Sequence, residues 1–123
     1  MHKEIRINRN VPLNDRGQNA NIKFGNVSED TLKSFGFWNT EDSWYMDVVV
    51  CSEMDITFNI SIVKSTKEVI IDVLDEEFLQ PYDYQEMLGL NDIANEVHYK
   101  VQDCMKSLVD SGIIVGYNMG DYI

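Results

Sequence analysis

Residues 44–74, WYMDVVVCSEMDITFNISIVKSTKEVIIDVL, decide the fold class of this chain. They contain three runs rich in β-branched and aromatic residues, at 44–51, 56–64 and 68–74, and such runs are typical of strands. The linkers between the runs are short and polar, whereas a crossover between parallel strands needs a dozen or more residues. The runs therefore predict an antiparallel meander of three strands.

The middle run also predicts how the sheet is oriented. Apolar residues occupy the even positions from 56 to 62 and alternate with Thr57, Asn59 and Ser61. A period of two places these two sets on opposite faces of a strand. We therefore expect one buried face and one solvent-facing face.

Two helices are predicted on either side of this region. Asn91 is a typical N-cap for a long helix that Gly112 ends, and Ser28 and Gly36 delimit a short helix in the same way. A return strand is expected at 113–117. The long helix carries one apolar stripe at three- and four-residue steps: Ile93, Val97, Val101, Cys104, Met105 and Leu108. The predicted fold class is α+β, an antiparallel sheet of three central strands plus flanking strands, with the long C-terminal helix packed on one face.

Length and composition are those of one folded domain spanning residues 1–123, with a hydrophobic share of 44%. The longest apolar stretch, at 48–51, is far shorter than the roughly 20 residues that cross a bilayer, and no secretory signal precedes it. We expect Cys51 and Cys104 to be buried, reduced thiols. Together these features predict a cytoplasmic protein with no membrane partner.

Charge is strongly segregated along the chain. Residues 1–27 contain all three arginines and carry a net charge of +3, whereas residues 28–123 carry −14, which gives −11 in total. Alternation at 4–9, a turn at 14–17 and a second run at 21–24 predict that the basic segment is a hairpin or arm. Such an arm would lie against the acidic body or pair between subunits. The acidic body disfavours direct binding of nucleic acid.

The densest feature is the segment 75–86, DEEFLQPYDYQE, with five carboxylates and three aromatic rings around Pro81. Because proline interrupts a helix, we expect 75–90 to form a loop or a single helical turn. Carboxylates attract lysine and arginine, while the rings supply contact area and cation–π faces, so the segment is a candidate contact surface for a basic protein. The candidate partner-binding residues are Asp75, Glu76, Glu77, Phe78, Tyr82, Asp83 and Tyr84.

Two alternatives remain for this segment. It would be a solvated loop if Phe78 and Tyr84 merely cap the core. It would be a cation site if the oxygens of Asp75, Glu77 and Asp83 converge, although their spacing matches no EF-hand.

No other group of residues predicts catalysis. His98 is six positions from Cys104 on the helix, so the two lie on different sides of it, and nothing in the sequence places Cys51 nearby. Asp47 and Asp72 are expected on the wet face of the sheet. A cluster of aromatic residues is expected to be mainly core: Phe35, Phe37, Trp38, Trp44 and Tyr45. We therefore expect no enzymatic activity, no cofactor and no metal site.

The sequence thus favours a small acidic binding protein that neutralises a basic protein partner. An immunity protein or antitoxin against a nuclease toxin and a phage-type inhibitor both fit, because each presents negative charge where nucleic acid would bind. The alternative is a structural or accessory domain without catalytic activity that self-associates, for instance as a homodimer, through a sheet edge or the aromatic cluster.

Overall fold

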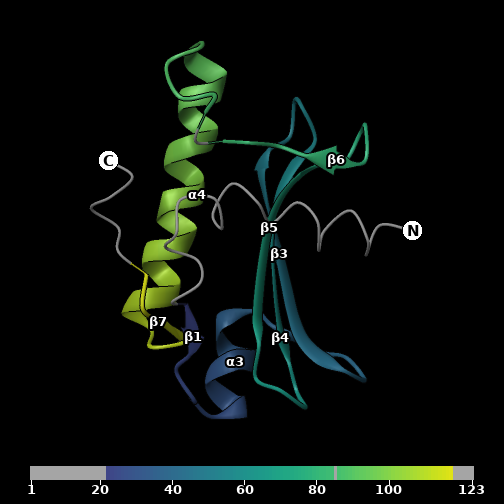
Figure 1. Cartoon of the computed structure of the whole chain (residues 1–123), viewed down its shortest axis with the longest axis vertical. Coiled ribbons are helices and arrows are strands. Elements are labelled where there is room, and N and C mark those ends of the chain that lie inside the picture. The colour runs from purple at the N-terminus through teal and green to yellow at the C-terminus, as the bar shows by residue number, and fades with distance from the viewer. Residues whose placement is uncertain (1–21, 85, 118–123) are drawn as a thin grey trace.

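The computed structural model describes residues 22–84 and 86–117, and its main sheet has five antiparallel strands in the order β2-β3-β4-β5-β6 (Figure 1). The three long strands are β3 (Ser43–Cys51), β4 (Ile56–Val63) and β5 (Val69–Asp75). They pair in sequence order, with Phe58 of β4 between Val48 and Val73. The predicted meander is confirmed.

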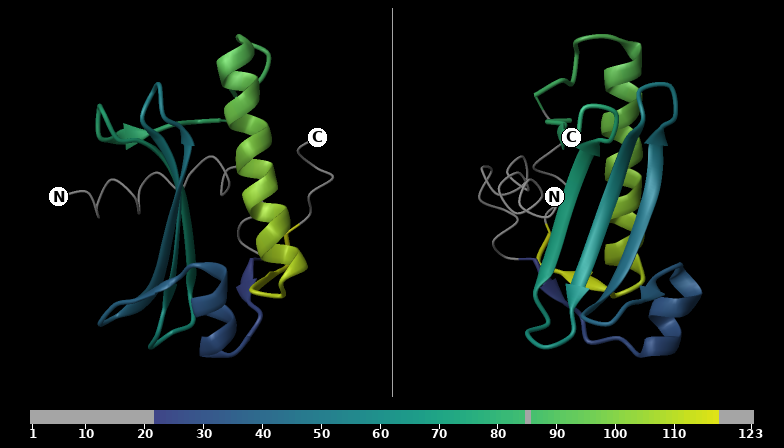
Figure 2. Two further views of the ribbon diagram at one scale, coloured as in Figure 1. Left: turned by 180° about the vertical axis from the view of Figure 1, so that it is seen from behind. Right: turned by 90° about the vertical axis from the view of Figure 1, so that its right-hand side faces the viewer.

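The helix α4 (Asp92–Asp110) lies along one face of this sheet (Figures 1 and 2). It begins as predicted, because Asn91 Oδ1 accepts a hydrogen bond from the backbone N–H of Ala94 (2.8 Å). Its last residue is Asp110, two residues before Gly112, whose φ of +81° suits glycine. The stripe of α4 and the even-numbered side chains of β4 form the centre of the core: Val97, Val101, Met105, Leu108, Ile56, Phe58, Ile60 and Ile62. The α+β class and the packing of the long helix are confirmed.

The short helix α3 (Glu29–Phe35) also lies where the sequence predicts it. Ser28 Oγ accepts a hydrogen bond from the backbone N–H of Thr31 (3.2 Å), and Gly36 ends the helix with a φ of +122°. Leu32 is buried and Phe35 is half-buried against the core. Packing of this apolar edge compensates for the low intrinsic stability of a two-turn helix.

A second, small sheet joins the two ends of the described chain. β1 (Lys23–Phe24) pairs antiparallel with β7 (Ile114–Val115). The expected strands near 21–24 and 113–117 therefore exist, but among the described residues they pair with each other. The remaining part of the predicted basic hairpin, at 4–9 and 14–17, lies outside the described residues.

Gly25 shows why this junction tolerates no larger residue. Its N–H donates to the carbonyl oxygen of Ile113 (2.8 Å), and a Cβ atom at Gly25 would lie 1.8 Å from the carbonyl oxygen of Gly112. Two backbones approach here at a distance that any side chain would prevent.

Both flanking strands are short edge strands. β2 (Trp38–Asn39) pairs with β3, and β6 (Gln80–Pro81) pairs with the end of β5. The sequence predicts a loop or helical turn around Pro81, and the structure has an edge strand instead. Proline fits this position because an edge residue can do without a backbone donor.

The sheet face opposite α4, here called the outer face, differs from the expected wet face. In Figure 2, right, this face points to the viewer and no described helix or strand lies over it. Thr57, Asn59 and Asp72 are nevertheless buried. They are flanked by polar groups that bond to one another: Tyr45 Oη donates to Asn59 Oδ1 (2.5 Å), and Asn59 Nδ2 donates to Thr57 Oγ1 (2.9 Å). The face is polar as predicted, but its centre is not solvent-exposed.

Candidate partner-binding end

Among the described residues, one end of the molecule collects carboxylates and contains no lysine or arginine. It comprises the turn after β3, the turn after β5 and the segment 82–96 that leads into α4, all at the top of Figure 1. The first two turns are joined by a backbone hydrogen bond from Glu76 N–H to the carbonyl oxygen of Asp55 (2.8 Å). We call this region the acidic end; its carboxylates are Glu53, Asp55, Asp75, Glu76, Glu77, Asp83, Glu86, Asp92 and Glu96.

Four of the six described lysines lie at the other end of the structure. Lys23, Lys33, Lys64 and Lys67 are on β1, on α3 and around the turn between β4 and β5, at the opposite end. Across residues 22–84 and 86–117, six lysines face eighteen carboxylates, a net charge of −12. Lys100, on α4 one turn after Glu96, is the described lysine nearest to the acidic end along the chain. Nine carboxylates against this one neighbouring lysine leave the potential of the acidic end strongly negative.

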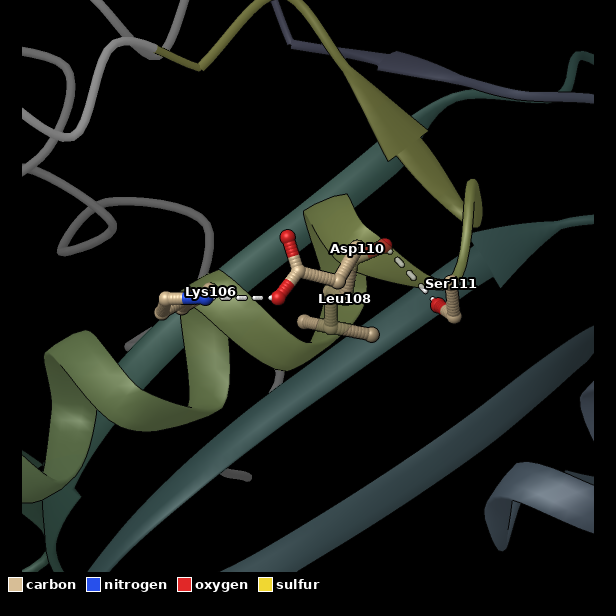
Figure 3. A network of polar contacts seen from close by, with 4 residues as sticks. All are labelled: Lys106, Leu108, Asp110 and Ser111. Carbon is tan, nitrogen blue, oxygen red and sulfur yellow. Dashed lines mark hydrogen bonds and ion pairs between the residues drawn. The ribbon is translucent and has the colours of Figure 1, made fainter.

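Lys106 illustrates the contrast, because it is ion-paired far from the acidic end. Its Nζ lies 2.7 Å from Asp110 Oδ2 near the end of α4, beside Ser111, whose hydroxyl donates to the carbonyl oxygen of Leu108 (Figure 3). The hydrogen bond to Asp110 raises the pKa of Lys106. Both side chains are well exposed, so this pair contributes little to stability.

The turn after β5 is built around the carboxylate of Asp75. Asp75 Oδ1 accepts hydrogen bonds from the backbone N–H groups of Glu77 (3.1 Å) and Phe78 (3.2 Å). Glu76 Oε2 accepts a hydrogen bond from Thr57 Oγ1 (2.6 Å), which ties the turn to β4. Two carboxylates of the candidate segment thus hold the turn in place.

The tip of this turn presents apolar side chains to solvent. Phe78 is 67% exposed and Leu79 is 47% exposed. Leu79 has a φ of +53°, a left-handed conformation that is rare for a bulky residue. Such backbone strain, together with exposed apolar side chains, is typical of binding sites.

Three predicted contact residues are corrected by their burial. Tyr84 is fully buried, with its ring 5.5 Å from that of His98, and Tyr82 and Asp75 are also buried. Burial, and then the nearby Cys51 and Asp75, raise the pKa of Tyr82. Tyr82 and Tyr84 belong to the hydrophobic core, and Asp75 supports the turn through its hydrogen bonds to backbone N–H groups. Glu77 and Phe78 are at the surface, and Glu76 and Asp83 are half-buried.

The structure adds residues that the segment 75–86 did not include. Glu53, Met54 and Asp55 belong to the adjacent turn, and Leu88 and Leu90 are exposed before α4. A simple signal marks much of this region: no lysine or arginine occurs from Glu68 to Tyr99. The turn after β3 lies outside this stretch of sequence. It joins the acidic end only because β3, β4 and β5 pair, and the absence of lysine and arginine does not predict that pairing.

The proposed cation site receives no geometric support. Asp75 Oδ1 serves the turn, and Asp83 Oδ1 accepts from the backbone N–H of Glu86 (3.2 Å). Within residues 22–84 and 86–117, no group of three or more histidine, cysteine, aspartate or glutamate side chains is arranged to hold a metal ion.

We expect Asp75→Ala to lower the free energy of unfolding by about 1–2 kcal/mol, because two backbone donors lose their acceptor. Glu77→Ala in the same turn should change it by less than about 0.5 kcal/mol, because the Glu77 side chain is exposed. Urea denaturation of both variants measures the difference. Equal effects would contradict the supporting role of Asp75.

The other candidate groups are mainly structural. Phe37 and Trp44 are buried, but Trp38 is 66% exposed and packs against Tyr45 with ring centroids 6.3 Å apart. Cys51 is buried, and burial raises the pKa of Cys104 to about 11. A thiol with such a pKa is a poor nucleophile at neutral pH.

Asp47 and Asp72 occupy one cross-strand row of the outer face. Asn59 pairs with Asp47 on one side and with Asp72 on the other, so the amide side chain separates the two carboxylates. Asp47 is exposed, whereas Asp72 is buried.

Comparison with known proteins identifies the fold. No protein-family model matches the chain, and no curated protein matches it. Among the described residues, no helix is long and apolar enough to cross a membrane. The structure is similar to the crystal structure of a DUF1831 family protein from Lactobacillus plantarum, with a TM-score of 0.60 and 11% sequence identity over 76% of this chain and 82% of that chain. The chain therefore shares the α+β fold of this DUF1831 protein.

Proposed function

We propose that this protein binds a basic protein partner through the acidic end and blocks the surface with which that partner binds nucleic acid. The observation that carries the proposal is the gathering of carboxylates and exposed apolar side chains at an end where the described residues include no lysine or arginine. An immunity protein or antitoxin against a nuclease toxin, or a phage-type inhibitor, would act in this way.

The two kinds of side chain have different roles in such a contact. Glu53, Glu77 and their neighbours would steer a cationic surface towards the acidic end and accelerate association. Phe78 and Leu79 would then be buried, and the Phe78 ring offers a face to arginine. The proposed contact is therefore centred on the tips of the two adjacent turns.

A titration of the ¹⁵N-labelled protein with a nona-arginine peptide tests the surface. We expect chemical-shift changes at residues 53–55 and 76–79, which disappear as salt is raised because screening weakens the attraction. A nona-glutamate peptide of equal length is the control and should leave these signals in place. Shift changes confined to the turn between β4 and β5 would contradict the proposal.

A second experiment tests neutralisation itself. A basic protein captured on the immobilised chain at low salt is purified and bound to labelled RNA or DNA. We expect the chain to displace the nucleic acid from that protein, since both would occupy one surface. A stable ternary complex of chain, partner and nucleic acid would refute the blocking mechanism.

Self-association is a second candidate function, favoured by the β3 side of the sheet. β2 pairs only with Trp44 and Tyr45 of β3. Along most of its length, the side of β3 that faces away from β4 therefore has no described strand next to it. Trp38 and Val49 are 66% and 60% exposed on this side. A dimer formed there would resist high salt in light scattering, because apolar association does not weaken as charges are screened.

A further inference from the structure

The edge of the main sheet at β3 has no described neighbour over part of its length. β2 pairs only with Trp44 and Tyr45, and the register between β3 and β4 shifts between Val49 and Cys51. Between these two points, no strand among the described residues lies next to residues 47–49 on the side away from β4. We call this stretch the open edge; β3 is the right-hand strand of the sheet in Figure 2, right.

The backbone groups that point to the open edge belong to Asp47 and Val49. The carbonyl oxygen of Ser43 accepts a hydrogen bond from the N–H of Thr40 (2.9 Å) and therefore faces away from β4. In an antiparallel sheet the N–H and C=O groups of every second residue point to the same side, so those of Asp47 and Val49 also face the edge. Both side chains are exposed. Such a row of backbone donors and acceptors is a template for a further strand.

An arginine side chain would have two partners at one position of the open edge. The residue opposite Asp47 in an added strand would lie beside its carboxylate, which is exposed on the outer face. Trp38 pairs with Tyr45, two residues before Asp47, so the Trp38 ring lies on the same face and next along the same line of residues. This ring is 66% exposed. A guanidinium at this position can pair with the carboxylate and lie against the indole.

The neighbouring position on the same face favours an apolar residue. Val49 is 60% exposed, and a β-branched residue directly opposite would cover it. All neighbouring strands of the main sheet are antiparallel, so an added strand of the same kind would meet Val49 first and Asp47 two residues later. The open edge therefore fits an extended segment with the pattern apolar, any residue, arginine.

We infer that the open edge takes up an extended segment of the basic partner as an antiparallel strand, with an arginine opposite Asp47 and a β-branched residue opposite Val49. The inference rests on the partner proposed above and adds the form in which it docks. Addition of an extended segment to a sheet edge is a general mode of peptide recognition, in which main-chain hydrogen bonds supply affinity and alternate side chains supply specificity.

Charge favours a basic segment over a second copy of this chain. Residues 22–84 and 86–117 carry a net −12, so two copies repel each other, whereas a basic segment is attracted. β3 also leads directly into the turn that carries Glu53 and Asp55 at the acidic end. A segment on the open edge therefore lies next to the acidic end, and one basic partner can contact both.

Hydrogen exchange of the ¹⁵N-labelled protein with a hexapeptide tests the inference. The peptide is Thr-Val-Thr-Arg-Thr-Ser, acetylated and amidated at its ends. Near saturation, exchange of the Asp47 and Val49 amides should slow by about tenfold or more, while the Val48 amide, which faces β4, is unchanged. This alternation within one strand distinguishes strand addition from diffuse attraction to an acidic surface.

The matched control peptide is N-methylated at its valine and its arginine. It keeps every side chain and the charge but loses the two N–H groups that would donate to the carbonyl oxygens of Val49 and Asp47. Its Kd should be higher by roughly tenfold. N-methylation of the threonine between them, whose N–H points away from β3, should raise the Kd much less.

Two protein variants test the side chains of the open edge. Asp47→Asn and Trp38→Ala change exposed residues, and each should weaken binding of the unmodified hexapeptide by about two- to fivefold. Glu41→Gln is the control, because Glu41 is an exposed carboxylate between β2 and β3, away from the open edge. It should leave the Kd unchanged.

The inference is overturned if the Asp47 and Val49 amides exchange equally fast with and without the hexapeptide, or if both N-methylated peptides bind as well as the unmodified one. It is also overturned if these amides are already protected in the free protein; protection that grows with protein concentration would identify a second copy as the occupant. The proposed function fails separately. In that case nona-arginine leaves residues 53–55 and 76–79 unshifted, whereas the hexapeptide still protects the open edge.

Discussion

Reversing two carboxylates of the acidic end, with Glu53→Lys and Glu77→Lys together, is expected to slow association with a basic partner by about 10- to 100-fold at low salt. Both side chains are exposed and lie at the tips of adjacent turns, so the substitutions change the potential there by four charge units without disturbing the core. Stopped-flow measurement of the association rate with the purified partner provides the test. The difference should vanish near 1 M salt, where the screening length is about 3 Å.

The matched control for this variant is Glu41→Lys with Glu68→Lys. These two glutamates are also exposed and lie before β3 and before β5, at the opposite end of the molecule, so the net charge changes by the same amount. The control should slow association far less than the variant at the acidic end. Equal slowing by the two double variants would mean that net charge, and not the acidic end, governs association.

Replacing Phe58 with alanine is expected to lower the free energy of unfolding by about 3–5 kcal/mol. Phe58 is fully buried on the central strand, between Val48 and Val73 and under α4, so its removal leaves a cavity that these neighbours cannot fill. Thermal and urea denaturation measure the loss. The control is Val49→Ala, at the residue after Val48 on β3, where the side chain is 60% exposed. This substitution should change the free energy of unfolding by less than about 0.5 kcal/mol. A similar loss in both variants would contradict the assignment of Phe58 to the centre of the core.

The segment 75–86 shows how far its composition could predict which side chains lie at the surface. Composition correctly identified a carboxylate-rich turn with aromatic residues, but it did not separate Phe78, which is exposed, from Tyr84, which is buried. Both are aromatic residues that directly follow a carboxylate, Glu77 or Asp83, so their local sequences are alike. Their difference comes from position: Phe78 lies at the tip of a turn, whereas Tyr84 returns to the core against His98.

The sequence by itself determined the elements whose signals are local. Alternation in β4, the apolar stripe of α4 and the caps Ser28 and Asn91 each depend on residues within a few positions of one another, and all were confirmed. Such signals can be read without knowing the fold, because the period of a helix or strand and the geometry of a cap are fixed by the backbone.

Only the tertiary structure decided which distant segments meet. The pairing of β1 with β7 and the addition of β2 and β6 at the sheet edges have weak local signals, because each strand has two residues. The same holds for the acidic end, where Asp55 and Glu76 come together through the pairing of β4 with β5. Pairing between distant segments depends on the free energy of the whole packed sheet. The local sequence around a residue therefore does not predict which distant residue it will pair with.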